Sequence, residues 1–176
     1  VGSEMCIRDR AKFHYINAGI GGTTSHFGTA RAESDLLSHR PDFVIIEFSV
    51  NDESTEFFRE TYEGLVRRVW QDENEPAVML VHNVYYNNGG NAQIMHGQIA
   101  RHYQLPAVSM QSSIYPEVVA GRIPNREITE DDLHPNDKGH ELVASVITYA
   151  LDKIRMAQTD DEEPEFPAPL TQNCYE

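Results

Sequence analysis

Cysteine and basic residues are scarce in this chain, and their scarcity argues against several classes of protein. Only two cysteines are present, Cys6 and Cys174, and each lies near one end of the chain. We therefore expect neither a disulfide framework nor a cysteine-ligated metal site. The 14 lysines and arginines are outnumbered by 28 aspartates and glutamates, giving a formal net charge of −14. Because phosphate binding needs clusters of basic side chains, we expect no nucleic-acid partner.

Long apolar runs and nucleotide-binding loops are also missing. No stretch approaches the roughly 18 apolar residues of a membrane-spanning helix, so no membrane span is expected. The glycines at 19, 21 and 22 lack the spacing of a dinucleotide-binding loop, and no phosphate-binding Gly-Lys-Ser/Thr is present. We expect no cofactor. A metal site built from Asp131, His134 and His140 is the weaker interpretation, because an acid–base pair already explains the first two. Composition leaves the compartment and the oligomeric state open.

The first ten residues differ in character from the rest. Residues 1–10 have neither the apolar stretch nor the cleavage site of a signal peptide, and they show no regular period. Their back-translation resembles a transposon adapter from sequencing libraries; the alternative is an unusual natural N-terminus. We expect residues 1–10 to derive from the adapter, and the native chain to have entered from further upstream.

Strand-like and helix-like segments alternate along the chain. Short apolar runs predict strands at residues 13–16, 43–48, 77–81 and 107–110, and helical spacing marks residues 29–39, 58–69, 95–103 and 142–154. This alternation predicts one three-layer α/β domain with a mainly parallel sheet over residues 11–156. Residues 157–176 are acidic and proline-containing. We interpret them as a tail, a linker, or the start of a further domain.

A histidine and an aspartate lie ahead of the last predicted helix. His134 follows Asp131 by three residues and precedes Pro135, which disfavours helix at His134 and keeps it on a loop. A histidine general base needs an acceptor on its second ring nitrogen, and Asp131 can supply it. A surface Asp-His pair near a helix start is the alternative. Asn136 or Asp137 can cap the helix that follows.

Two further segments end predicted strands with groups that can stabilise an oxyanion. Asn51 follows the strand at 43–48, and its side-chain amide can donate to a developing negative charge. Gly22 follows the strand at 13–16, and glycine lets a backbone N–H approach a ligand closely. Taken alone, each is better explained as an ordinary turn. In a parallel sheet, however, ligand sites lie at the carboxyl ends of the strands, where both segments are expected.

Taken together, these segments resemble the SGNH (GDSL-type) hydrolases, which are serine esterases built on a flavodoxin-like sheet. The resemblance covers about residues 13–155. It implies that the Gly22 N–H and Asn51 form the oxyanion hole, that His134 is the catalytic base, and that Asp131 orients it.

The sequence departs from the family pattern at two points. Ser49 stands where the family usually has glycine, which is a mild change. The first block, Gly-Asp-Ser, is absent, and its expected position is upstream of Ala11. Ser25 and Ser49 do not lie in a nucleophile elbow, so neither replaces the missing serine. We therefore expect an incomplete domain that lacks its first strand and nucleophile, and a fragment that is poorly stable and inactive.

The resemblance implies a serine ester hydrolase acting on short acyl esters, including O-acetylated carbohydrate, with a small-molecule or carbohydrate ester as its partner. The alternative is a non-catalytic carbohydrate-binding relative of the same fold. A flavodoxin-like cofactor binder is disfavoured by the missing phosphate loop. His82 and Asn83 follow the strand at 77–81 and could contact substrate, although a strand-end turn explains them equally well.

Overall fold

The computed structural model describes residues 13–157 and 166–174. The predictions made for residues 1–10 and for the acidic stretch at 160–165 lie outside the described residues.

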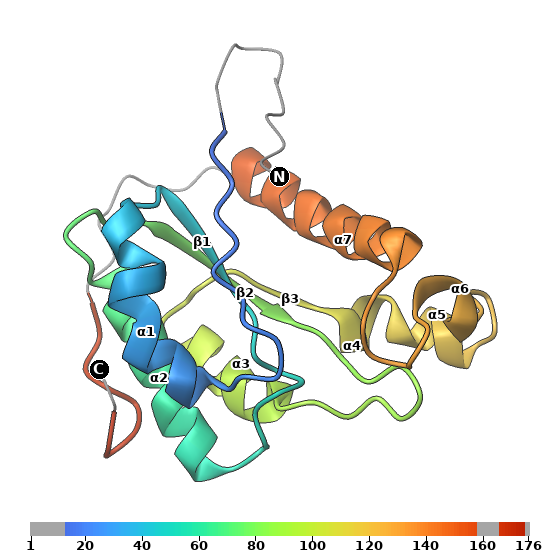
Figure 1. Cartoon of the computed structure of the whole chain (residues 1–176), viewed down its shortest axis with the longest axis horizontal. Helices are drawn as coiled ribbons and strands as arrows, with labels where there is room; N and C mark the ends of the chain where they lie inside the picture. Colours follow the sequence, from blue (N-terminus) through green and yellow to red (C-terminus); the bar gives the residue numbers. More distant parts are fainter. Residues whose placement is uncertain (1–12, 158–165, 175–176) are drawn as a thin grey trace.

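Three parallel strands form the sheet in the described part of the chain (Figure 1). They are β1 (Phe43–Ile46), β2 (Ala77–His82) and β3 (Ala107–Ser109), in the order β1-β2-β3. Phe43 pairs with Ala77, and Leu80 pairs with Ala107. The apolar, β-branched composition of these runs suits strands covered on both faces. The expected parallel sheet is confirmed.

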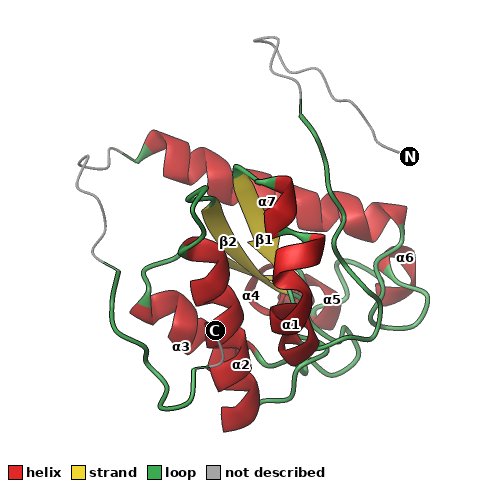
Figure 2. Ribbon diagram, turned by 60° about the vertical axis from the view of Figure 1, so that its left-hand side comes forward, coloured by secondary structure: helices red, strands yellow, loops and turns green. Residues whose placement is uncertain are grey.

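Helices cover both faces of this sheet (Figures 1 and 2). One layer holds α1 (Ser25–Asp35), η1 (Leu37–His39), α2 (Glu56–Trp70) and α3 (Gln93–His102). The opposite face carries α7 (Asp137–Met156). Three short helices, α4 (Met110–Ser113), α5 (Tyr115–Val119) and α6 (Asn125–Ile128), connect β3 to α7. The molecule is thus a three-layer α/β domain, as the sequence predicts.

The strands contribute side chains to a separate core on each face. Val44 and Leu80 pack in the first core with α2 residues such as Tyr62. Val81 and Val108 pack in the second core against the apolar stripe of α7. Residues that alternate along a strand point to opposite faces, so one strand serves two layers.

The first helix begins earlier than its spacing suggests. The sequence predicts a helix over residues 29–39, whereas α1 starts at Ser25 and ends at Asp35. Thr24 makes no side-chain cap, and the Ser25 N–H is instead donated to Asp52 Oδ1 at 2.8 Å. The cap comes from a residue distant in sequence, so local patterning could not locate this helix start.

The predicted strand at residues 13–16 is not formed. These residues pair with no strand in the described structure, and Phe13, Tyr15 and Ile16 are exposed. A strand needs a neighbour for its backbone hydrogen bonds, and an apolar run cannot supply one by itself.

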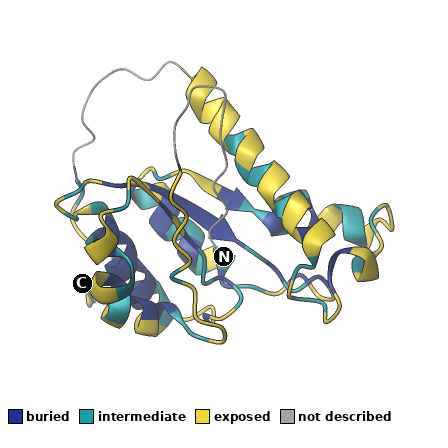
Figure 3. Ribbon diagram, turned by 45° about the horizontal axis from the view of Figure 1, so that its top comes forward, coloured by how far each residue is buried: buried dark blue, intermediate teal, exposed yellow. Residues whose placement is uncertain are grey.

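Apolar side chains are also exposed on β1 and α7. Phe43 and Ile45 alternate with buried neighbours on β1 and are 42% and 46% exposed. Much of α7 is exposed as well (Figure 3), including Tyr149 and Ile154. No helix among the described residues is long and apolar enough to cross a membrane.

The described end of the predicted tail packs on the domain. Phe166 contacts the ring of Trp70, with ring centroids 4.8 Å apart, and Thr171 is buried. Residues 166–174 thus contact the domain, and their assignment to a tail, a linker or a further domain stays a prediction. The local composition is that of a flexible segment, but α2 supplies specific acceptors and rings for it.

Candidate active site

The loop before α7 holds Asp131 and His134 in direct contact. Asp131 Oδ2 lies 2.6 Å from His134 Nδ1, and Asp131 Oδ1 accepts the backbone N–H of His134 at 2.8 Å. The carboxylate thus fixes both the ring and the backbone of the histidine. This contact leaves His134 Nε2 as the ring nitrogen available to a reacting group.

Local sequence explains the shape of this loop. Thr129 and Pro135 form an antiparallel bridge that closes it, and Asp132 has a left-handed φ of 71°. Thr129 Oγ1 accepts the Asp132 N–H at 2.9 Å. At its end, Asn136 Oδ1 accepts the Gly139 N–H at 3.1 Å and caps α7, which decides between the two caps that the sequence offers, Asn136 and Asp137.

Hydrogen bonding keeps Asp131 ionised. The His134 side chain, followed by the backbone N–H groups of His134 and Leu133, lowers the pKa of Asp131 well below its usual 3.8. Each of these groups donates to the charged form of the carboxyl and so favours that form. Both side chains are open to solvent, with 79% of His134 and 54% of Asp131 exposed.

Gly22 and Asn51 lie on exposed turns at the carboxyl-end edge of the sheet. Gly22 has a left-handed φ of 71°, which a side chain would strain, and it lies three residues before α1. The Asn51 N–H donates to Phe48 O at 3.1 Å, in the turn that follows β1. Both residues are exposed, and their role in an oxyanion hole stays a prediction.

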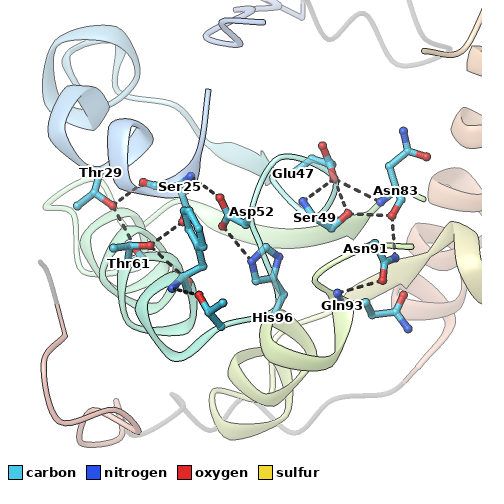
Figure 4. A network of polar contacts seen from close by, with 12 residues as sticks. Ser25, Thr29, Glu47, Ser49, Asp52, Thr61, Asn83, Asn91, Gln93 and His96 are labelled. Atoms are coloured by element: carbon cyan, nitrogen blue, oxygen red, sulfur yellow. Dashed lines mark hydrogen bonds and ion pairs between the residues drawn. The ribbon is translucent and has the colours of Figure 1, made fainter. Parts of the chain in front are cut away.

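A single carboxylate ties these two turns together (Figure 4). Asp52, the neighbour of Asn51, accepts the N–H of Ser25, which lies three residues after Gly22. The two segments are far apart in sequence, and this hydrogen bond joins them. Asp52 also contacts His96 Nε2 at 3.0 Å.

The loop between β2 and α3 connects the Asn51 turn to the histidine loop. The Tyr85 hydroxyl donates to Val50 O at 3.4 Å, beside Asn51. The next residue, Tyr86, donates its N–H to Asp132 O at 2.7 Å. The Asn51 turn and the His134 loop are therefore each hydrogen-bonded to this loop, although no hydrogen bond is found among the described residues Gly22, Asn51 and His134.

His82 is the last residue of β2 and is buried, and Asn83 follows it and is half-buried. His82 is 3% exposed, and neither ring nitrogen has a hydrogen-bond partner in the described structure. Burial, with the adjacent His96 as a smaller cause, lowers the pKa of His82 to about 4. The backbone carbonyl of Asn83 accepts from Asn91 Nδ2 at 2.8 Å. Substrate contact by His82 and Asn83 stays a prediction.

Two open pockets lie near these residues. The smaller, of about 300 Å³, includes Asp131, His134 and Asn136. The larger, of about 640 Å³, lies between α3 and β3 and includes His82, Gln93 and Ser109. Among the described residues, the smaller pocket contains a histidine in contact with a carboxylate at the surface. No group of three or more potential metal ligands is found within the described ranges.

Sequence comparison identifies the family. Residues 5–142 match the model of the GDSL-like lipase/acylhydrolase family. This chain belongs to that family. The thioesterase 1/protease 1/lysophospholipase L1 of Escherichia coli strain K12 is 25% identical over 155 residues, which cover 82% of this chain and 70% of the relative.

Solved structures of GDSL-like and related esterases share the fold. A two-domain esterase active on acetylated mannans is 74% identical, with a TM-score of 0.91. The match covers 93% of this chain and 44% of that protein, so the chain spans less than half of its length. A catalytic mutant of an acetylxylan esterase from Geobacillus stearothermophilus, at 20% identity and a TM-score of 0.60, shows the fold alone.

The sequence did not predict the buried polar residues that are hydrogen-bonded beneath the candidate site. Asp52 is the neighbour of Asn51, which the sequence analysis identified, but no sequence motif around His96 indicates that it contacts Asp52. Ser49 proves fully buried, with its hydroxyl 2.6 Å from Glu47 Oε1 and 2.9 Å from Asn83 O. The polar residues following β1 are the only signal that a supporting network exists.

Proposed function

We propose that this chain is part of the catalytic domain of a serine esterase that removes short acyl groups, in particular acetyl groups, from carbohydrate. The observation that carries the proposal is the 2.6 Å contact between Asp131 and His134 in a member of the GDSL-like family. A histidine held by a carboxylate on its Nδ1 side is the base that acyl transfer by serine requires.

In the proposed reaction, a serine hydroxyl from a Gly-Asp-Ser block outside this chain attacks the ester carbonyl carbon. Its proton passes to His134 Nε2, and Asp131 stabilises the resulting imidazolium. The carbonyl oxygen becomes an oxyanion, which the Gly22 N–H and the Asn51 side-chain amide hold by hydrogen bonds.

Collapse of this intermediate breaks the bond to the alcohol, whose oxygen takes the proton from His134. A water molecule then attacks the acyl-enzyme, and His134 accepts the water's proton. The second collapse releases the carboxylic acid and returns the proton to the serine oxygen.

The choice of substrate rests on a relative. The esterase that shares 74% identity acts on acetylated mannans, which makes an acetylated polysaccharide the first substrate to test. The polar, aromatic loop between β2 and α3 contains Tyr85, Asn87 and Asn88 and borders the histidine loop, where the sugar of such a substrate would lie.

Exposed apolar side chains support the proposal that a further strand lies upstream of Ala11 in the native protein. Phe43 and Ile45 on β1, together with Tyr149 and Ile154 on α7, are the surfaces such a strand and its helix would cover. This strand would end at the nucleophile.

The deciding experiment begins with the native gene upstream of the codon for Ala11. The complete gene product is assayed for acetate release from acetylated mannan, alongside its His134→Ala variant. We expect a Gly-Asp-Ser block upstream and a loss of about 10³-fold or more in kcat in the variant. Native sequence without such a serine, combined with binding but no hydrolysis of the polysaccharide, would instead indicate a carbohydrate-binding relative.

A further inference from the structure

A buried carboxylate joins the two turns to which the oxyanion hole is assigned. Asp52 Oδ1 accepts the Ser25 N–H at 2.8 Å, which fixes the start of α1 and the segment leading back to Gly22. The N–H groups of Asn51 and Asp52 both donate to Phe48 O, which sets the turn that carries Asn51. The side chain of Asp52 is fully buried, so no solvent competes for these contacts.

His96 holds the other oxygen of this carboxylate. Its Nε2 lies 3.0 Å from Asp52 Oδ2, and its side chain is also fully buried. The imidazole stacks on the ring of Tyr62, with centroids 3.6 Å apart and planes 4° from parallel. The stack holds the plane of the ring, and Nε2 points at Asp52 (Figure 4).

The contacts of Asp52 and His96 join three separate parts of the fold. Ser25 opens α1, Asp52 follows β1, and His96 lies on α3. A buried carboxylate must be satisfied by donors, because its desolvation is costly otherwise. Its position is therefore set jointly by the Ser25 N–H and by His96.

We infer that Asp52 and His96 form a positioning pair that holds the Gly22 segment and the Asn51 turn at the spacing needed to bind the reaction's oxyanion. This inference rests on the proposed function. Neither residue touches the reacting atoms; both act through the two donors. A displacement of these donors of the order of 1 Å is expected to lower kcat about 10²-fold while substrate binding is largely kept.

The first test uses variants of the complete gene product. His96→Phe keeps a ring stacked on Tyr62 but removes the donor to Asp52, and His96→Gln restores a donor. We expect the Phe variant to lower kcat about 10- to 100-fold with KM within about twofold, and the Gln variant to recover most of that loss. His102→Phe, at the end of the same helix, is the matched control and should keep the wild-type kcat.

A second pair of variants tests the same contact from the other end. Ser25→Pro removes the N–H that Asp52 accepts, and proline is tolerated at the first position of a helix after an extended residue such as Thr24. Ser25→Ala removes only the hydroxyl. The proline variant should lower kcat at least tenfold more than the alanine variant. This comparison decides the matter if His96→Phe does not fold.

A double-mutant cycle separates positioning from general destabilisation. If His96 acts through the oxyanion hole, its replacement by Phe should cost less in kcat when Asn51 is already Ala. Equal costs in both backgrounds would overturn the inference.

A further measurement on the complete gene product needs no turnover. Hydrogen exchange of the Ser25 amide should be at least tenfold faster in His96→Phe than in the wild type, whereas the Gly139 amide, bonded to Asn136, should exchange at an unchanged rate. Unaltered Ser25 exchange would overturn the inference.

The two proposals fail differently. A His134→Ala variant with near-normal kcat would contradict the proposed function. Suppose instead that His134→Ala is inactive while His96→Phe and Ser25→Pro keep the wild-type kcat. The esterase proposal would then stand, and the positioning role of Asp52 and His96 would be disproved.

Discussion

The carboxylate of Glu63 binds Thr171, a residue 108 positions later in the chain. Glu63 Oε2 accepts the Thr171 backbone N–H at 2.8 Å and its hydroxyl at 2.5 Å, and Oε1 accepts the Leu170 N–H at 2.6 Å. One turn further along α2, Arg67 donates to Pro167 O at 2.9 Å. These contacts attach residues 166–174 to the outer surface of α2.

Replacing Glu63 should detach this segment. In Glu63→Gln, an amide nitrogen takes the place of one acceptor oxygen and faces donors it cannot satisfy. We expect the free energy of unfolding to fall by about 1.5–3 kcal/mol, the range for hydrogen bonds to a charged group. Urea unfolding checks this, with the exposed Glu73→Gln as the control. Equal stability of the two variants would show that the contact contributes little.

The same attachment should weaken in acid. Burial raises the pKa of Glu63, but hydrogen bonds from Thr171, Tyr103 and the Leu170 and Thr171 N–H groups outweigh it, so the net pKa lies below the usual 4.5. A lowered pKa in the folded state means that the carboxylate stabilises the fold above about pH 4.5 and loses this effect as the pH falls through the folded-state pKa. The protection of the Leu170 amide, its intrinsic exchange rate divided by its observed rate, should therefore fall between pH 5 and pH 3. In Glu63→Gln this fall in protection should disappear.

Asp131→Asn should disable His134 without removing it. The amide can present its nitrogen to His134 Nδ1 and so favour the wrong tautomer of the ring. We expect kcat of the complete gene product to fall by about 10²- to 10⁴-fold with little change in KM. Because hydrogen bonds from His134 and Leu133 keep the pKa of Asp131 below 3.8, its titration should cause no break in the wild-type rate between pH 5 and pH 9. Near-normal turnover in the Asn variant would contradict the assigned role.

Ser49→Gly restores the family's usual residue but should destabilise this chain. The Ser49 hydroxyl is buried between Glu47 Oε1 and Asn83 O, and its removal leaves both acceptors with one partner fewer. We expect a loss of about 1–3 kcal/mol in unfolding free energy, most of which Ser49→Ala should share. Thermal unfolding of both variants checks this. A stabilised Ala variant would mean that water replaces the hydroxyl at no cost.

Two helical glycines should respond in opposite ways to alanine. A Cβ on Gly139, beside the histidine loop, would lie 2.3 Å from the Ile128 carbonyl oxygen, and backbone cannot move aside cheaply. Gly139→Ala should therefore cost about 1–3 kcal/mol or more. A Cβ on Gly97 meets only the flexible end of Arg101 at 3.4 Å, so Gly97→Ala should stabilise by about 0.5–1 kcal/mol. Chemical denaturation of Gly139→Ala and Gly97→Ala gives the sign of each change in the free energy of unfolding.

Local patterns predicted the sheet and much of the histidine loop. The apolar runs at Phe43 and Ala77 became strands because they are apolar and β-branched, and Asn136 capped α7 because its side chain reaches a nearby N–H. Asp131 meets His134 across three residues, a distance that the loop alone can set. Such features depend on neighbours in the chain, so the sequence shows them.

Features that depend on contacts between distant residues could not be predicted from the sequence. The apolar run at 13–16 forms no strand, since pairing requires a partner elsewhere. The start of α1 depends on Asp52, and the packing of the proline-containing residues 166–174 depends on Glu63.

By itself, the sequence determined the three-layer α/β class, the family and the Asp131–His134 pair, because periodicity and motifs are properties of neighbouring residues. Only the tertiary structure decided which buried carboxylates meet which backbone donors: Asp52 with Ser25 and His96, and Glu63 with Thr171. The physical reason is that desolvation forces a buried charge to find donors, while chain topology alone decides which donors come within reach.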